Sequence, residues 1–185
     1  MKEIEVEIKF PLKNPRPIIT FLDRSGEFKG EDYQKDTYFV PPTKNFLGKS
    51  PVAEWLRIRE GKGKPNINYK NWDREKHNSW SVCDEYEVMM DDAEAMKKIF
   101  AGLSFKEIIV VEKKRKNWHF KDTIISIDEV KDLGSFIEIE SNRHFESNKE
   151  AVAYLHKILL ELDAEVGEQD FKGYPYLLLE KNGLL

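Results

Sequence analysis

Ionisable side chains recur along this chain in pairs that stand two positions apart, and each pair carries one sign of charge. The acidic pairs are Glu5 and Glu7, Glu85 and Glu87, and Glu138 and Glu140, and the basic pairs are Arg57 and Arg59, and Lys113 and Arg115. Two carboxylates at this spacing on an extended strand lie ~7 Å apart, where their repulsion costs about 2.4 kcal/mol at an effective dielectric of about 20. Inside a closed sheet, this repulsion must be compensated by opposite charge.

Carboxylates on some strands and guanidinium or ammonium groups on others suit a polyphosphate bound together with a divalent metal ion. Mg²⁺ takes one or two protein carboxylates, keeps several waters and accepts phosphate oxygens. Arginine forks match the geometry of phosphate, and lysines add point charge. The competing interpretation is a sheet whose salt-bridged outer face is solvated. We favour a charged interior, because each apolar strand face needs cover and the helices of the chain can supply it.

The charged pairs alternate with hydrocarbon side chains, which is the periodicity of β-strands. In residues 3–10, Glu5 and Glu7 share one face with Lys9, and the apolar residues between them share the other. The same alternation predicts strands within residues 33–40, 55–59, 67–70, 85–88, 108–115, 125–128 and 136–140.

Three helices are indicated by residue types that cap helix ends. They run from Asn14 and Pro15 to Gly26, from Asp91 or Asp92 to Gly102, and onward from a capping box of Ser147 and Glu150. Residues 174–183 form a short apolar turn or helix. With the apolar strand faces packed outward on the helices, we predict an α+β protein, a closed antiparallel eight-stranded β-barrel with a charged lumen. No composition break divides the chain, so residues 1–185 are expected to form a single domain.

The overall composition argues against several functional classes. Charged residues make up 35% of the 185 residues, but the net charge is only −4, so no basic excess points to nucleic acid. Cys83 is the single cysteine, which excludes an internal disulfide and a multi-cysteine zinc site. No apolar run approaches the ~18 to 20 residues that span a membrane. We therefore expect a cytoplasmic protein that binds neither nucleic acid nor membrane, with a homodimer left open.

The string Glu5-Val6-Glu7-Ile8-Lys9 resembles the ExExK signature of the CYTH superfamily, the triphosphate tunnel metalloenzymes. That superfamily includes class IV adenylate cyclases, thiamine triphosphatases and inorganic triphosphatases. Further matching strings follow in the family's order and are Asp36-Thr37-Tyr38-Phe39, Leu56-Arg57-Ile58-Arg59, Tyr69-Lys70, Glu85-Tyr86-Glu87, Lys113-Lys114-Arg115, Ile127-Asp128, Gly134-Ser135-Phe136-Ile137-Glu138-Ile139-Glu140 and Lys172-Gly173-Tyr174. The resemblance spans nearly the whole chain and implies an eight-stranded antiparallel tunnel that binds triphosphate with Mg²⁺ or Mn²⁺.

The residue pattern and the resemblance together predict roles for the charged groups. The metal ion is expected on Glu5, Glu7, Asp128, Glu138 and Glu140, with Glu85, Glu87 and Asp36 as second choices. The phosphates are expected on Lys9, Arg57, Arg59, Lys70, Lys113, Arg115 and Lys172. The candidates for catalytic proton transfer are Lys9, Tyr38 and Lys70.

Two reactions can use the same charged tunnel. In a cyclase the ribose 3′-oxygen attacks the α-phosphorus of ATP and releases pyrophosphate, whereas in a triphosphatase water attacks the terminal phosphorus of thiamine triphosphate or tripolyphosphate. The resemblance is closest to the class IV adenylate cyclase branch, in the strings from Gln34 to Phe39 and from Gly134 to Glu140. A catalytically silent module that binds nucleotide or polyphosphate is the alternative of another class.

Two features bear on the mouth of such a tunnel. The stretch between Val40 and Glu54 is longer than a simple hairpin, so its contacts with substrate are left open. The four tryptophans lie beside loops, where they either line a base-binding rim or, more often, pack in the core or the loops. They are Trp55, Trp72, Trp80 and Trp118.

Overall fold

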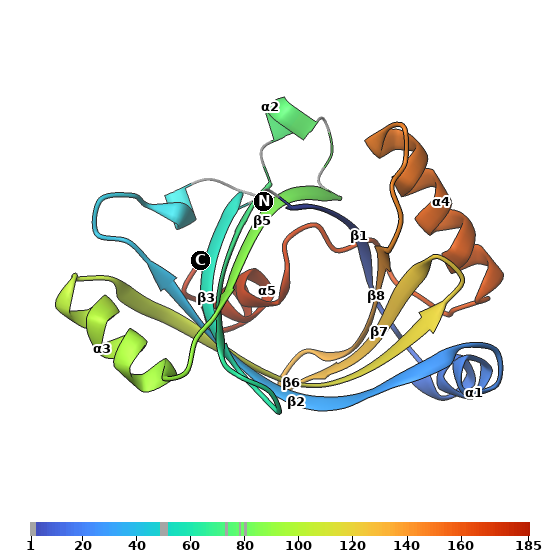
Figure 1. Ribbon diagram of the computed structural model, residues 1–185, viewed down its shortest axis with the longest axis horizontal. Helices are drawn as coiled ribbons and strands as arrows, with labels where there is room; N and C mark the ends of the chain where they lie inside the picture. Colours follow the sequence, from blue (N-terminus) through green and yellow to red (C-terminus); the bar gives the residue numbers. More distant parts are fainter. Residues whose placement is uncertain (1–2, 49–51, 73, 78, 80) are drawn as a thin grey trace.

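The computed structural model describes residues 3–48, 52–72, 74–77, 79 and 81–185. Within these residues, eight antiparallel strands close into a barrel in the order β1-β5-β4-β3-β2-β6-β7-β8, seen as a ring in Figure 1. The strands are β1 (Glu3–Pro11), β2 (Glu27–Val40), β3 (Glu54–Glu60), β4 (Asn66–Asn71), β5 (Val82–Met89), β6 (Lys106–Phe120), β7 (Thr123–Val130) and β8 (Gly134–Ser141). The helices are α1 (Pro15–Ser25), the 3₁₀ turn η1 (Phe46–Gly48), α2 (Arg74–His77), α3 (Ala93–Gly102), α4 (Asn148–Glu161) and α5 (Tyr174–Lys181). The predicted fold class is confirmed.

Strand β1 closes the barrel by dividing its pairing between two neighbours. Residues 3–6 pair with β5, and residues 7–11 pair with β8. Where the pairing changes over, the Glu7 N–H donates to the carbonyl oxygen of Ser81 at 2.9 Å. As a result, the charged residues of β1 lie beside those of β8, with Glu7 opposite Glu140 and Lys9 opposite Glu138.

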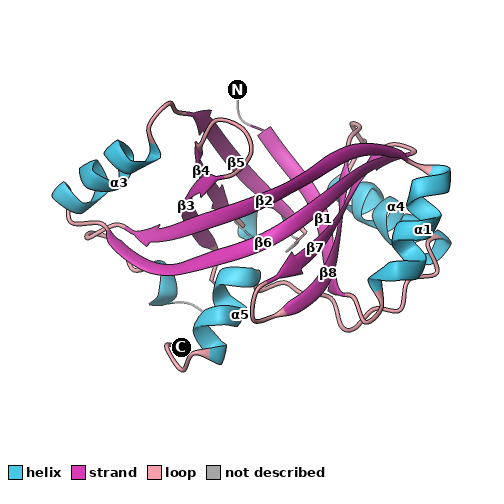
Figure 2. Ribbon diagram, turned by 90° about the horizontal axis from the view of Figure 1, so that it is seen from below, coloured by secondary structure: helices cyan, strands magenta, loops and turns pink. Residues whose placement is uncertain are grey.

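The helices cover the apolar outer faces of the strands. Helix α4 packs on β1 and β8, and α1 packs on β2 and β6. Leu22 of α1 and Leu155 of α4 join Ile8, Trp118 and Ile139 of the barrel in one buried cluster. Helix α3 packs on β3, and Figures 1 and 2 show α5 across one end of the ring. The apolar faces therefore point outward, and the charged faces are left for the lumen.

The long pair of β2 and β6 extends beyond the predicted strands. The sequence predicts a loop from Asn117, whereas β6 continues to Phe120. The continuation is stabilised because Trp118 is fully buried and its indole N–H donates to Asp23 of α1 at 3.0 Å. Strand β2 begins at Glu27, earlier than predicted, and pairs with this extension.

The predicted helix starts are confirmed by their caps. The side chains of Asn14, Asp92 and Ser147 each accept a backbone N–H from the first turn of α1, α3 and α4. The predicted end of α3 is wrong, because Gly102 is still helical and the left-handed residue is Ser104, with φ of 64°. None of the helices in the described ranges is long and apolar enough to cross a bilayer.

Replacing Leu155 with alanine should lower the free energy of unfolding by about 2 to 5 kcal/mol, because this fully buried side chain would leave a cavity between α4 and the barrel. Leu160 lies on the same helix but is 81% exposed, so Leu160→Ala should change that free energy by less than about 0.5 kcal/mol. Urea unfolding of both variants and the wild type measures the difference. Equal losses in the two variants would contradict the packing of α4.

Candidate functional site

The charged strand faces line one cavity inside the barrel, with a volume of about 240 Å³. The predicted site residues on its surface are Glu5, Glu7, Lys9, Tyr38, Arg57, Arg59, Lys70, Glu85, Glu87, Lys113, Arg115, Glu138, Glu140 and Lys172. The two remaining predicted residues, Asp36 and Asp128, lie behind this surface and are 1% and 0% exposed. The structure therefore gathers residues from eight strands around one space.

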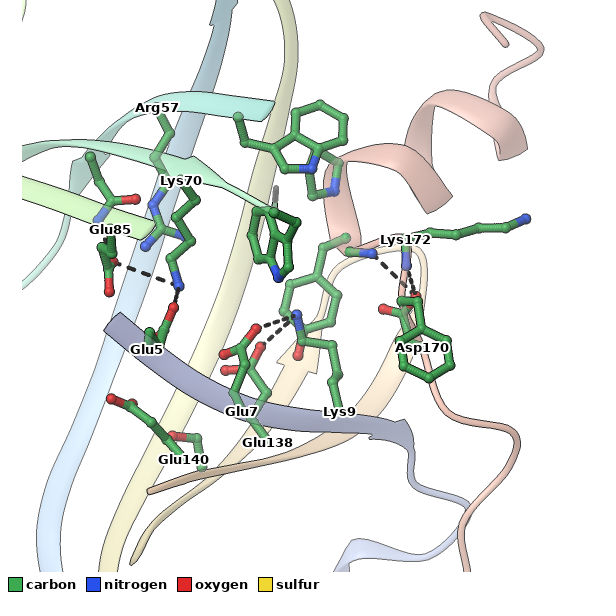
Figure 3. Close-up of a pocket in the computed structure, with 18 of the residues that line it drawn as sticks. Glu5, Glu7, Lys9, Arg57, Lys70, Glu85, Glu138, Glu140, Asp170 and Lys172 are labelled. Carbon is green, nitrogen blue, oxygen red and sulfur yellow. Dashed lines mark hydrogen bonds and ion pairs between the residues drawn. The ribbon is translucent and has the colours of Figure 1, made fainter. Parts of the chain in front are cut away.

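An acidic cluster of Glu5, Glu7 and Glu140 forms where β1 meets β8 (Figure 3). Burial raises the pKa of Glu5 to about 7, against the attraction of Lys70 and with repulsion from Glu7 adding to the rise. Burial, followed by repulsion from Glu5 and Glu7, raises the pKa of Glu140 to about 8. Lys70 contacts Glu5 and lies 3.6 Å from Glu85. The only other lysine near this cluster among the described ion pairs is Lys9, 3.9 Å from Glu7. Three carboxylates thus share two lysines that also pair with Glu85 and Glu138, so the cluster can attract further positive charge.

Asp36 holds the two arginines of β3 in the lumen. Its carboxylate accepts hydrogen bonds from Nε and Nη2 of Arg59 at 2.7 Å each and from Nη1 of Arg57 at 3.2 Å. Burial alone would raise the pKa of Asp36, but the two guanidinium groups outweigh it and hold that pKa well below its ordinary value. Both oxygens of this second-choice metal residue are therefore engaged by arginine.

Asp128 has the same relation to the cations of β6. It accepts hydrogen bonds from Nε and Nη2 of Arg115 at 2.7 and 2.5 Å, from Nζ of Lys113 at 3.1 Å and from the hydroxyl of Tyr174 at 2.8 Å. Burial opposes its ionisation, but Arg115 and Lys113 hold the pKa of Asp128 below its ordinary value. The sequence places Asp128 in the metal set, whereas the structure places it behind the cations, where it orients them.

Glu138 is shared between two cations. Its carboxylate lies 2.9 Å from Nζ of Lys9 and also contacts Arg115, which together hold its pKa well below the ordinary value despite burial. Burial and the neighbouring Arg115 lower the pKa of Lys113 to about 7. Lys9 and Lys113 both lie over the ring of Tyr174, at 4.4 and 5.0 Å from its centre. The base of the cavity is thus a network of alternating charge.

The second-choice residues of β5 differ in their surroundings. Glu85 accepts a hydrogen bond from Asn68 and lies 3.6 Å from Lys70, whereas Glu87 lies farther along β5 and is exposed. Glu85 therefore orients polar groups of β4. Tyr38, a candidate for proton transfer, lines the cavity but is only 5% exposed.

Lys172 differs from the other predicted phosphate residues. Its ammonium lies over the ring of Tyr176 at 4.9 Å and 3.2 Å from Glu180 of α5. Figure 3 shows the backbone of Lys172 beside the cavity and its side chain directed away. Glu180 and Tyr176, on the following helix, explain this orientation.

Residues 167–173 form a strap beside the cavity, and of this strap the sequence predicts only Lys172 as a site residue, missing Gln169, Asp170 and Phe171, which also line the cavity. Its Gln169 donates to the hydroxyl of Ser81 at 3.2 Å, and the N–H of Asp170 donates to the carbonyl oxygen of Lys9 at 2.8 Å. Asp170 precedes Gly173, whose φ is 80°, and an aspartate before a glycine turn was the signal available in the sequence.

Three of the four tryptophans lie among the described residues, and they divide between the two predicted locations. Trp55 and Trp72 line the cavity, whereas Trp118 is in the core between α1 and the barrel. Trp80 lies outside the described residues, as do residues 49–51 of the loop before β3.

The acidic cluster fits a hard divalent cation, because carboxylate oxygens are the ligands that Mg²⁺ and Mn²⁺ prefer. Among the described residues, no three His, Cys, Asp or Glu side chains form a ready-made metal cage. Mg²⁺ does not require one, since it binds one or two carboxylates and fills its other positions with water and phosphate oxygens. Glu5, Glu7 and Glu140 are the residues placed to supply those carboxylates.

Comparisons with known proteins agree with the fold. The family model described as the CYTH domain matches residues 3–174. A protein of Methanocaldococcus jannaschii named "Putative adenylate cyclase MJ0240" is 34% identical over 140 residues, which cover 75% of this chain and 77% of that one. The structure of the PH1819 protein from Pyrococcus horikoshii OT3 has a TM-score of 0.81 at 33% identity and covers 96% of this chain and 99% of its own. The PH1012 protein from the same organism has a TM-score of 0.76 at 25% identity, over 92% and 97% of the two chains.

Thermal stability in EDTA should fall as the pH rises from about 5 to about 7. Folded Glu5 and Glu140, with pKa values raised to about 7 and about 8, hold protons in this window that the unfolded chain has released. Removing one titrating group by Glu140→Gln should therefore flatten the slope, whereas Glu129→Gln, at an exposed position of β7, should keep it. Melting curves at several pH values compare the slopes. A Glu140→Gln slope as steep as that of the wild type would contradict the acidic cluster.

Proposed function

The chain belongs to the CYTH domain family, and from that premise we propose that it is a metal-dependent enzyme acting on a triphosphate substrate. The observation that carries this proposal is that carboxylates and cations from different strands face the same lumen. Carboxylates of β1 and β8 face the lumen on one side, and the guanidinium groups of β3 and β6 face it from other strands. A metal ion and a chain of phosphates are the ligand that matches both sides at once.

The basic residues would bind the phosphates in a preset geometry. Asp36 and Asp128 occupy part of the hydrogen-bonding capacity of the arginines from behind, so the remaining N–H groups can reach phosphate oxygens. Because the side chains are already ordered, less conformational entropy is lost when the substrate binds. The residues expected to do this are Lys9, Arg57, Arg59, Lys70, Lys113 and Arg115, with Lys172 able to join only after leaving Glu180.

Glu5, Glu7 and Glu140 would hold Mg²⁺ or Mn²⁺, with Glu138 nearby. Burial and, after it, repulsion from neighbouring carboxylates raise the pKa values of Glu5 and Glu140, and this supports the assignment, because a cation bound among the carboxylates would favour their charged forms. A bound divalent ion would polarise the phosphoryl oxygens and offset their developing charge. The protein's own contribution is to align the triphosphate and exclude bulk water from the lumen.

We infer that the reaction is that of a class IV adenylate cyclase, with ATP converted to cyclic AMP and pyrophosphate. The strings from Gln34 to Phe39 and from Gly134 to Glu140 support this branch, as does the name of the Methanocaldococcus relative. Tyr38 and the lysines Lys9 and Lys70 lie on the cavity surface, where they could accept or relay the proton of the attacking hydroxyl.

Incubation with ATP and Mn²⁺, followed by chromatographic separation of the nucleotides, should yield cyclic AMP and pyrophosphate. EDTA should stop the reaction, because the carboxylate cluster would lose its metal ion. ADP with phosphate, or faster turnover of tripolyphosphate than of ATP, would identify a triphosphatase instead. Calorimetric binding without any product from ATP, thiamine triphosphate or tripolyphosphate would indicate a silent binding module and contradict the proposed enzyme.

Glu7→Gln should reduce kcat by at least about 100-fold while leaving the fold intact, because the variant keeps the size of the side chain but removes a charge from the metal cluster. Product formation at saturating ATP and Mn²⁺ measures the loss, and a thermal melt checks the fold. Glu129→Gln removes the same charge from an exposed position and serves as the matched control. Turnover at the wild-type rate in the Glu7→Gln variant would contradict the metal assignment.

A further inference from the structure

We propose that Asp170, Trp72 and Phe171 form a subsite that selects triphosphates carrying an aromatic heterocycle with hydrogen-bond donors, over inorganic tripolyphosphate. This inference rests on the proposed function and specifies which part of the substrate the mouth of the cavity recognises. All three side chains line the same cavity as the charged residues of the lumen. None of them is a residue to which the sequence assigns a metal or phosphate role.

Asp170 lines the cavity, and one of its two carboxylate oxygens has no hydrogen-bond partner among the described residues. Its Oδ1 accepts the backbone N–H groups of Lys172 and Gly173 at 2.8 and 3.1 Å. Its Oδ2 is buried and has no hydrogen-bond partner among the described residues. An unpaired buried polar atom is costly. A donor from a ligand that enters the cavity would satisfy this oxygen.

The position of Asp170 is set by the backbone on both sides of it. The strap runs along β1, where the N–H of Gly167 donates to the carbonyl oxygen of Pro11 at 2.9 Å and that of Asp170 to Lys9 at 2.8 Å. Gln169 fixes the strap to Ser81 at the start of β5. The carboxylate is therefore held in place before a ligand binds, which reduces the entropy lost on binding.

Neighbouring cations do not neutralise the free oxygen. Lys172, two residues away, directs its ammonium toward Glu180. The charge of Asp170 contributes to raising the pKa of Lys9. The ammonium of Lys9, however, forms its ion pair at 2.9 Å with Glu138. A carboxylate only accepts hydrogen bonds, so this part of the mouth favours neutral or cationic donors and repels additional phosphate.

Aromatic side chains line the same cavity as Asp170. Trp72 lines the cavity just beyond the end of β4, and the ammonium of Lys70 lies 5.8 Å from the centre of its ring. Its backbone N–H donates to the carbonyl oxygen of Ala53 at 2.8 Å. Phe171 is 47% exposed and lines the cavity from the strap. Flat apolar rings that share one cavity with a hydrogen-bond acceptor suit a heterocycle, which would stack on a ring and donate to the acceptor.

Both ATP and thiamine triphosphate carry an aromatic heterocycle with a hydrogen-bond donor, and the test includes both compounds. In ATP, the ribose hydroxyls and the adenine amino group are hydrogen-bond donors. In thiamine triphosphate, the donor is the amino group of the pyrimidine, and the thiazolium ring carries a positive charge. Tripolyphosphate has neither a ring nor a comparable donor. We therefore measure kcat and KM for the three substrates with the wild type, Asp170→Asn, Trp72→Leu and the control Glu168→Gln, which removes the same charge from an exposed position of the strap.

Asp170→Asn keeps an oxygen for the two backbone N–H groups but replaces the free acceptor with an amide. We expect it to raise KM by about tenfold for ATP, for thiamine triphosphate or for both, as expected for a lost charge-assisted hydrogen bond. KM for tripolyphosphate should change by less than about twofold, and Trp72→Leu should show the same selectivity. The substrate whose KM rises identifies the source of the donor. Glu168→Gln should leave all values near those of the wild type.

Equal KM changes for all three substrates in Asp170→Asn, or no change for any, would overturn the subsite while leaving the proposed function intact. Selective changes in Glu168→Gln of the same size would also overturn it, because general electrostatics would then be the cause. A wild type that turns over none of the three substrates would instead contradict the proposed function. In that case, calorimetric Kd values for ATP and tripolyphosphate, compared between the wild type and Asp170→Asn, still test the subsite.

Discussion

Asp36 and Asp128 lie buried beneath the basic side chains of β3 and β6, and the cavity depends on these two carboxylates. Closely spaced cations in a low-dielectric interior repel one another, and opposite charge close by offsets this repulsion. Both aspartates stand behind the arginines rather than in front of them. Removing a buried partner of this kind typically costs about 3 to 5 kcal/mol, because the other charge is left unpaired. The same contacts therefore stabilise the barrel and aim the guanidinium groups.

On the acidic side of the lumen, by contrast, the charged groups are not fully paired with opposite charge. Burial, together with repulsion from neighbouring carboxylates, raises the pKa values of Glu5 and Glu140 even though Lys70 attracts both groups. Isolated from any ligand, this side is a source of instability, as binding and catalytic sites often are. The barrel tolerates it because the outer faces of β1 and β8 contribute Ile8 and Ile139 to a large apolar cluster under α1 and α4.

Much of the fold and part of the site could be predicted from the sequence, because strand alternation assigns each side chain to a face. The acidic and basic pairs were placed in the lumen on that basis, and the structure puts them there. Alternation could not tell that Asp128 would lie behind Arg115 or that Lys172 would turn to Glu180, because both depend on partners in other elements. Nor could it find Asp170, whose place is set by a backbone contact with distant Lys9.

The divided pairing of β1 also has a mechanical consequence. The seam between β1 and β5 consists of residues 3–6 against 82–85, whereas β2 and β6 are paired along residues 27–40. The circumference is therefore stiff on one side and weakest where Glu5 stands near Lys70 across that seam. A ligand bound by residues on both sides of the seam between β1 and β5 would stabilise this short pairing. Ligand binding and closure of the barrel would then be thermodynamically linked.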